Sequence, residues 1–209
     1  MSIELFHQIL IGFSAVGLLV FIALFFVKAG YGMFRTAQWG FSIPNKIGWL
    51  LMEAPVFFVM LILWLQSDRS VLSVPFLFFL LFELHYFQRS FVFPFLMKGK
   101  SRMPVAIMLM GVVFNLLNGY IQGEWLFFLA PEDLYSSAYL CRINCWIGIL
   151  VFFLGMGINW HSDYVIRHLR QPGDTRHYLP EKGLYHWVTS GNYETLMMIT
   201  PSVAKRWPA

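Results

Sequence analysis

Long apolar segments dominate this sequence of 209 residues. The first covers residues 5–27 and contains no Asp, Glu, Lys or Arg. Four more follow, at residues 47–66, 71–97, 103–122 and 142–160. Each is close to the roughly 20 residues that an α-helix needs to cross about 30 Å of hydrocarbon. We therefore expect an all-α, polytopic transmembrane helix bundle with about five spans, forming a single membrane-embedded domain over residues 1–209.

Composition agrees with a membrane protein. Only 12% of the residues are charged and 58% are hydrophobic, whereas soluble domains carry about 25% charged residues. So few charges cannot cover the surface of a soluble particle of this size. The formal net charge of +4 indicates topology, and no basic stripe or nucleic-acid-binding module accompanies it, so we expect no nucleic-acid partner.

The charges between the spans predict an orientation. The connections after the first and third spans and the segment after the fifth carry Lys and Arg, and the first and third connections contain no acid. The fourth connection is acidic, with Glu124, Glu132 and Asp133. Because Lys and Arg gather on the cytoplasmic side of a membrane, we expect the N-terminus outside and the basic segments in the cytoplasm.

Two common cofactor patterns do not fit. Cys141 and Cys145 have no second pair of ligands, so we expect no zinc and no other metal site. The stretch "GMGINW" places two glycines as a dinucleotide fingerprint would, but Trp160 stands where the third glycine belongs. It also ends an apolar helix instead of following a strand, which excludes a Rossmann dinucleotide-binding motif. A nucleotide site must then be built between helices.

Ionisable side chains inside the second and third spans are the first candidates for function. Burying a charge in a membrane costs about 2.5 kcal/mol or more unless the group is sheltered. One interpretation is a structural cluster, in which Glu53 or Glu83 pairs with Arg89 while Tyr86 packs. The other is a proton-donating set, in which Glu53 and the Tyr86 hydroxyl bind a substrate carbonyl and stabilise charge that develops on its oxygen. The residues alone leave both open.

A second candidate lies where the fifth span ends. If that helix continues beyond the membrane, Asn159, Asp163, Arg167 and Arg170 fall at i, i+4, i+8 and i+11 and form one stripe. The stripe is either a solvated helix end with an Asp163–Arg167 pair, or a site for a polar, anionic ligand whose phosphates the arginines would hold. Spacing alone does not decide between them.

Three motifs in this sequence strongly resemble the steroid 5-alpha-reductase family. They are "LHYFQRSF", "GMGINWHSDYVIRHLRQPG" and "LPEKGLYHWVTSGNY", in family order and with similar spacing. The resemblance covers roughly residues 45–193. It implies a membrane reductase, with seven spans as the family expectation, that uses NADPH to reduce the 4,5 double bond of 3-oxo-Δ4 steroids to 5-alpha-dihydrosteroids. Hydride would go to C5 and a proton to C4.

The resemblance also implies residue roles. A glutamate and a tyrosine that polarise the 3-keto group correspond to Glu53 and Tyr86. A cytoplasmic cofactor segment corresponds to residues 159–193. The positions expected to hold NADPH are Arg89, Lys100, Asn159, Asp163, Arg167, Arg170 and Asn192. We expect a monomer in contact with membrane lipid, located in the plasma membrane if bacterial and in the endoplasmic reticulum if eukaryotic.

The family pattern diverges after Tyr193. There the family continues with further helices, whereas this sequence reads "ETLMMITPSVAKRWPA". Glu194 stands too close to Asn192 for the family's glutamate, whose position Leu196 takes. We therefore expect part of the cofactor cage to be missing. The alternatives are a reductase of another enone, polyprenol or enoyl thioester lipid, a membrane methyltransferase of similar architecture, and a catalytically inactive truncated or structural membrane protein.

Overall fold

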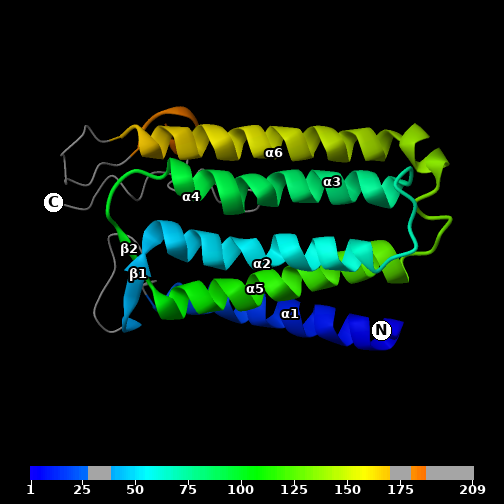
Figure 1. Cartoon of the computed structure of the whole chain (residues 1–209), viewed down its shortest axis with the longest axis horizontal. Helices are drawn as coiled ribbons and strands as arrows, with labels where there is room; N and C mark the ends of the chain where they lie inside the picture. The colour runs from blue at the N-terminus through cyan, green and yellow to red at the C-terminus, as the bar shows by residue number, and fades with distance from the viewer. Residues whose placement is uncertain (28–38, 170–179, 187–209) are drawn as a thin grey trace. The chain divides into compact units, whose positions relative to one another are not determined.

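The computed structural model describes residues 1–27, 39–169 and 180–186. The chain divides into two compact units, Met1–Tyr139 and Leu140–Ala209. Figure 1 shows the helices and strands of the chain with their labels.

The first unit is built from helices joined by short connections. Its long helices are α1 (Ile3–Ala23), α2 (Asn45–Leu65), α3 (Val74–Phe87) and α5 (Val105–Glu124). The π-helical segment η3 (Gln88–Val92) joins α3 to the short α4 (Phe93–Leu96), and a second π segment, η4 (Trp125–Leu129), extends α5. Two three-residue strands, β1 (Ser42–Pro44) and β2 (Arg102–Pro104), precede α2 and α5, and the 3-10 turn η5 (Ser137–Cys141) follows η4 at the boundary of the units.

The second unit contains one long helix in its described part. Helix α6 runs over Ile143–Arg167, and the 3-10 turn η6 covers Gly183–His186. The helix continues without a break through the polar end of the fifth apolar segment. The helix therefore ends seven residues beyond the predicted span end at residue 160, which meets the condition under which Asn159, Asp163 and Arg167 share one stripe.

Five helices are long and apolar enough to cross a membrane, which confirms the predicted all-α polytopic fold within the described residues. They are Ile3–Ala23, Asn45–Leu65, Val74–Leu96, Val105–Leu129 and Ile143–Arg167. All five start within three residues of the predicted spans, and the first three also end within four residues of them. The predicted orientation, with the N-terminus outside, stays a prediction.

The fourth span is longer than its sequence pattern predicts. The predicted span ends at residue 122 because Gly123 and Glu124 follow it, but the helix continues to Leu129. Glu124 is buried, and its Oε1 lies 3.0 Å from the amino group of Met1. The neighbouring Trp125 stacks on Phe6 of α1, with ring centroids 5.8 Å apart. An ion pair with the amino group of Met1, just before α1, thus shelters a charge that would otherwise mark a span end.

A small antiparallel sheet, which the sequence pattern does not predict, joins two connections. β1 pairs with β2 in the register Ser42↔Pro104, Ile43↔Met103 and Pro44↔Arg102. The pairing continues on both sides, since Val105 N–H donates to Phe41 O (2.9 Å) and Asn45 N–H donates to Ser101 O (3.0 Å). Because α2 and α5 begin directly after these strands, the sheet fixes their starts side by side (Figure 1).

Glycines let α2 and α5 approach closely. A Cβ on Gly119 of α5 would lie 3.2 Å from the backbone oxygen of Val56 on α2. On Gly123 it would lie 2.6 Å from Leu63. Small residues at helix contacts are the usual means by which membrane helices pack tightly, since lipid offers no hydrophobic drive for association. This contact sets the spacing of the two helices that carry most of the polar cluster described below.

An aromatic cluster and an arginine lie at the C-terminal ends of α2 and η4, opposite the β1–β2 sheet. Trp64 of α2 stacks on Phe79 of α3 with ring centroids 5.0 Å apart, and both pack with Phe127. Arg69 donates from Nε to Phe127 O (3.1 Å) and from Nη2 to Ala130 O (2.8 Å). These carbonyls lie at the end of η4, where no further helical N–H group is available to donate to them. Arg69 supplies the missing donors.

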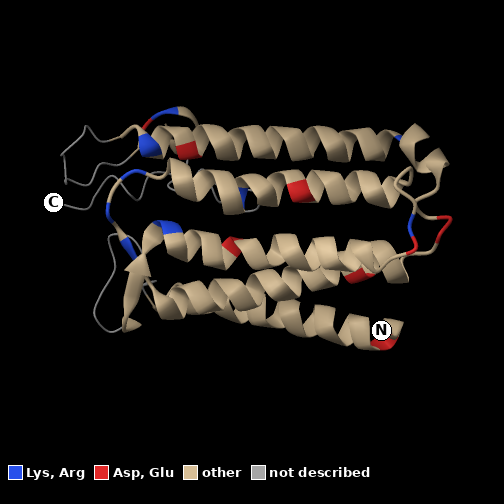
Figure 2. Cartoon of the chain, in the orientation of Figure 1, with Lys and Arg blue, Asp and Glu red and all other residues tan. Residues whose placement is uncertain are grey.

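Charged side chains are sparse along the helices of the first unit and gather at its ends (Figure 2). The end that carries β1 and β2 has four exposed cations among its described residues: Lys46, Lys98, Lys100 and Arg102. The acidic Glu132 and Asp133 lie in the connection after η4, away from that end. Few charges lie between the two ends: Glu53 and Arg89 belong to the candidate site, and Glu83 is buried on α3.

Candidate functional site

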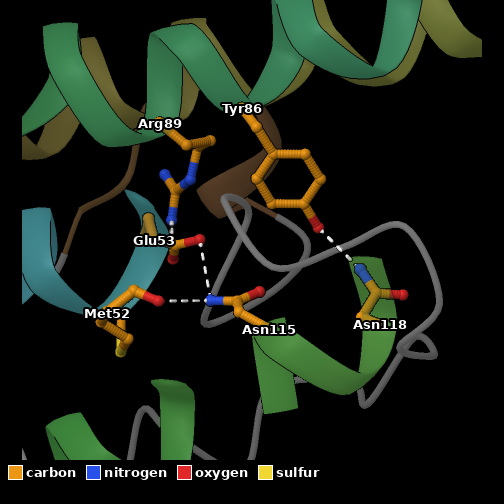
Figure 3. A network of polar contacts seen from close by, with 6 residues as sticks. All are labelled: Met52, Glu53, Tyr86, Arg89, Asn115 and Asn118. Atoms are coloured by element: carbon orange, nitrogen blue, oxygen red, sulfur yellow. Dashed lines mark hydrogen bonds and ion pairs between the residues drawn. The ribbon is translucent and has the colours of Figure 1, made fainter. Parts of the chain in front are cut away.

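Glu53 is the charged residue at the centre of the candidate site in the first unit. It lies in the third turn of α2, two residues before Pro55, and its side chain is largely buried, with 12% exposed. Figure 3 shows Tyr86 of α3 and Arg89 of η3 pointing toward the helices that carry Glu53, Asn115 and Asn118. Glu53 Oε1 lies 3.8 Å from Arg89 Nη2, an ion pair beyond hydrogen-bond length.

Arg89 is held by aromatic rings as well as by charge. It lies in η3 and is buried, with its guanidinium carbon 4.8 Å from the ring centroids of both Trp49 and Phe93. A cation over aromatic faces is stabilised by the negative potential of the rings. The π-helical turns of η3 are of the kind often found at functional sites, where they change the direction of side chains. Arg89 is thus sheltered inside the span, beside Glu53.

Asn115 of α5 connects Glu53 to the backbone of α2. Its Nδ2 donates to Met52 O at 2.8 Å and to Glu53 Oε2 at 3.3 Å. Asn115 is itself buried. The two bonds fix the Glu53 carboxyl between an amide donor and a guanidinium, while Oε1 accepts no hydrogen bond from Arg89 at 3.8 Å.

Tyr86 meets a second asparagine of α5. Asn118 Nδ2 donates to the Tyr86 hydroxyl oxygen at 3.1 Å (Figure 3). The phenol ring also packs at 4.6 Å from the ring of Phe82. A phenol oxygen that accepts from an amide still has its own O–H to donate. Tyr86 therefore presents a hydrogen-bond donor inside the bundle.

The contacts agree in part with a structural cluster and are compatible with a proton-donating set. Glu53, and not Glu83, pairs with Arg89, as the structural interpretation allows. Tyr86 does more than pack, because it lies in a polar network. Neither Asn115 nor Asn118 is marked as a site residue by the sequence pattern. The signal that could have found them is their spacing of three on one face of an otherwise apolar span.

In the second unit, α6 carries the predicted polar stripe as far as it is described. Asn159 and Arg167 are half-buried, and Asp163 is buried with 2% of its surface exposed. Arg167 Nε donates to the backbone oxygen of Asp163 at 3.2 Å. The contact recorded between these two residues therefore involves the Asp163 backbone, where the structural interpretation expected its carboxylate.

The segment around Gly183 packs against the same part of α6. Gly183 has φ +64°, and a Cβ at this position would collide with the His161 ring. Tyr185, in the same 3-10 turn, is buried. Because an L side chain rarely adopts this φ and the ring leaves no room for one, glycine is required here. The contact holds the segment against His161, which lies between Asn159 and Asp163 on α6.

The remaining expected cofactor positions are Lys100, Arg170 and Asn192. Lys100 is exposed in the connection between α4 and β2. Arg170 and Asn192 lie outside the described residues. Among the described residues, no three His, Cys, Asp or Glu side chains form a group that could hold a metal ion. The roles expected for all these positions stay predictions.

The apolar helices and the buried polar cluster define a multi-pass membrane protein with ionisable groups sheltered inside its spans. Residues 101–208 match the family model of 3-oxo-5-alpha-steroid 4-dehydrogenase. Together with the relatives below, this match shows that the chain belongs to the 3-oxo-5-alpha-steroid 4-dehydrogenase family, which is an oxidoreductase family and therefore a family of enzymes.

Relatives from animals and plants align over most of the chain. It is 35% identical to 3-oxo-5-alpha-steroid 4-dehydrogenase 2 of Sus scrofa over 189 residues, covering 88% of this chain and 73% of the relative. It is 31% identical to steroid 5-alpha-reductase DET2 of Gossypium hirsutum, covering 90% of this chain and 74% of the relative. The human 3-oxo-5-alpha-steroid 4-dehydrogenase 2 is 35% identical, with coverages of 82% and 68%. The family resemblance carried by the three motifs is thereby confirmed.

Proposed function

We propose that this protein uses NADPH to reduce the 4,5 double bond of 3-oxo-Δ4 steroids. The observation that carries the proposal is the Tyr86–Asn118 hydrogen bond inside a bundle that belongs to the steroid dehydrogenase family. Asn118 donates to the phenol oxygen, so the Tyr86 O–H is oriented away from Asn118 and is available to a ligand. A ketone oxygen is a suitable acceptor for it.

Reduction of a conjugated ketone builds negative charge on the oxygen. Hydride addition at C5 turns the enone into an enolate, and protonation at C4 completes the reaction. Hydrogen-bond donors already aimed at the oxygen stabilise the enolate more than the ketone, because its charge is larger. Tyr86 would act as one such donor. An apolar bundle strengthens this interaction by excluding water.

Glu53 would be the second group at the carbonyl. Its Oε2 accepts from Asn115 and its Oε1 lies beyond hydrogen-bond distance of Arg89. Oε1 is thus the atom available to the substrate oxygen. In its acid form Glu53 would donate a hydrogen bond to the ketone oxygen. The nearby Arg89 cation would offset negative charge beside it. Asn115 would keep the carboxyl in place.

The residues of the second unit fit a dinucleotide in their chemistry. The Ser162 hydroxyl is buried and has no hydrogen-bond partner within the described residues. It lies on α6 between Asn159 and Asp163, whose amide and carboxylate suit ribose hydroxyl and amide groups. NADPH, when bound, supplies the hydride.

The cations complete the proposed cofactor set. Arg167 would bind phosphate oxygens, as would Arg170, while Asn192 would add an amide contact. Lys100 and Arg89 are assigned to the cofactor by the family resemblance. We expect the enzyme to act as a monomer with access to substrate from the surrounding lipid. Its membrane is the plasma membrane or the endoplasmic reticulum, according to the cell that makes it.

The test is turnover by the purified chain in detergent or liposomes. The chain is incubated with NADPH and testosterone or progesterone, and loss of the enone ultraviolet band is followed. Steroid reduction in step with NADPH oxidation supports the proposal. Steady NADPH oxidation with a polyprenol or enoyl thioester, but not with a steroid, would replace the substrate class. Binding of S-adenosylmethionine without NADPH binding would favour a methyltransferase and refute reduction.

A further inference from the structure

Glu83 is a buried acid that the proposed reaction does not use. It lies on α3 with 8% of its surface exposed. Both carboxyl oxygens are buried, and neither has a hydrogen-bond partner among the described residues. The cation that could have paired with it, Arg89, lies instead at Glu53 and over two aromatic rings. A buried polar group without a partner costs stability, so its presence calls for an explanation.

Its position on the helix shows which way Glu83 faces. Phe79, Glu83 and Tyr86 are spaced i, i+4 and i+7, so they share one face of α3. Phe79 stacks on Trp64 of α2, and Tyr86 accepts a hydrogen bond from Asn118 of α5. Because residues on both sides of Glu83 meet α2 and α5, Glu83 lies on the α3 face directed toward these two helices.

The distance along the helix matches an elongated ligand. Arg89, which marks the level of Glu53, lies six residues beyond Glu83, or about 9 Å along the axis at roughly 1.5 Å per residue. Tyr86 lies between them. A rigid lipid of fused rings, with its oxo oxygen at Glu53 and Tyr86 and its long axis along the helices, would extend toward Glu83.

We propose that Glu83 determines substrate specificity by accepting a hydrogen bond from a hydroxyl group at the end of the substrate opposite its oxo group. The ligand class is a hydroxylated 3-oxo-Δ4 lipid with fused rings. The inference rests on the proposed function, because that function places the oxo group at Glu53 and Tyr86. It explains the unpartnered carboxyl, since a hydroxyl donor on the substrate satisfies it only when substrate is bound.

The experiment compares two steroids that differ in one group. Testosterone carries a hydroxyl at C17, and androst-4-en-3-one lacks it. Dissociation constants for both are measured on the full chain in detergent with NADP⁺, which carries no hydride to transfer, for the wild type, Glu83→Leu, Glu83→Gln and the control Gln88→Leu. Gln88 is a half-buried polar residue at the end of the same helix, on another face. Turnover of each steroid is recorded in parallel.

We expect the wild type to bind testosterone about tenfold more tightly than the deoxy steroid, as one hydrogen bond to a charged or buried group allows. Glu83→Leu should bring the ratio close to one, Glu83→Gln should keep part of it, and Gln88→Leu should keep all of it. Glu83→Leu should also melt at the same or a higher temperature, because it removes an unpartnered buried acid.

The two hypotheses fail in different ways. A ratio that is the same in the wild type and Glu83→Leu overturns the role of Glu83, even when the enzyme reduces both steroids. A ratio that depends on Glu83 in a protein that reduces neither steroid supports the binding role and refutes the proposed reaction. A wild type that binds neither steroid overturns the inference.

Discussion

The Asn118 side chain donates a hydrogen bond of 3.1 Å to the hydroxyl oxygen of Tyr86, joining α5 to α3 inside the span. The direction of this bond matters more than its length. It occupies an acceptor site on the phenol and leaves the phenol proton for another partner. A purely structural Tyr–Asn pair would function equally well in either direction, whereas a group that polarises a substrate ketone must donate to it.

Replacing Tyr86 by Phe should lower kcat about 10²-fold, because removal of one donor to a developing oxyanion typically has such an effect. The fold should persist, since the ring still packs beside Phe82. Steady-state kinetics with NADPH and testosterone measure the loss, and the melting temperature serves as the control. Full activity in Tyr86→Phe would remove this residue from the chemistry.

Asn118 is a positioning residue in this scheme, and its loss should act through Tyr86. We expect Asn118→Ala to lower kcat by about tenfold with little change in NADPH binding, and to add almost nothing in the Tyr86→Phe background. A double-mutant cycle on kcat provides the measurement. Effects that simply multiply in the double variant would show that Asn118 acts independently of Tyr86.

Glu53→Gln should remove most turnover while leaving NADPH affinity near normal. The amide keeps the shape of the carboxyl but has no acid proton, and it also leaves the Arg89 cation without its carboxylate partner at 3.8 Å. Because breaking a buried pair can destabilise a protein by about 3–5 kcal/mol, the melting temperature must be measured with the kinetics.

Arg89→Leu combined with Glu53→Gln removes both charges and serves as the stability control. Unchanged kcat in a folded Glu53→Gln enzyme would show that Glu53 is structural only.

The glycine contact between α2 and α5 can be tested without touching the polar cluster. Gly119→Ala places a methyl group 3.2 Å from the backbone oxygen of Val56, which cannot move as a flexible side chain can. We expect the free energy of unfolding to fall by about 1–3 kcal/mol, typical of overpacking.

Gly148→Ala on α6 is the matched control, since a Cβ there meets nothing within 4 Å. Its expected effect is neutral or slightly stabilising, because Ala is the better helix former. Thermal melts in one detergent compare the two, and equal melting temperatures would contradict the close packing.

Much of this architecture is predictable because a membrane imposes simple rules on a sequence. Apolar length alone marks all five helices, whereas the extension of the last helix to Arg167 is only a condition of the predicted polar stripe. The rules fail where tertiary contacts override them. Glu124 reads as the end of a span but is sheltered by the amino group of Met1. The strands β1 and β2 are three residues long and depend on pairing between distant connections, so no local pattern marks them.

The sequence predicts which ionisable residues belong to the site but not which of them pair with one another. Ionisable groups in a span are rare enough to mark Glu53, Glu83, Tyr86 and Arg89 as residues that need partners. Which acid meets Arg89 depends on how α2 and α3 face each other, and that is decided by packing across helices. The two asparagines of α5 are polar but uncharged, so they do not interrupt the apolar pattern and are easily passed over.

The turn at Gly183 offers a last test that links local geometry to cofactor binding. Gly183→Ala introduces a side chain at φ +64° and against the His161 ring, so it should displace the segment that packs beside Asn159 and Asp163. We expect NADPH affinity to fall by about tenfold or more, with smaller effects on steroid binding, because one to two kcal/mol of backbone strain corresponds to such a factor. The double variant Gly183→Ala, His161→Ala removes the ring and should recover only part of the loss, since the φ strain persists. Calorimetric titration with NADPH measures each variant, and Gly157→Ala on α6, where a Cβ meets nothing within 4 Å, is the control. Wild-type affinity in Gly183→Ala would show that this turn does not support the cofactor site.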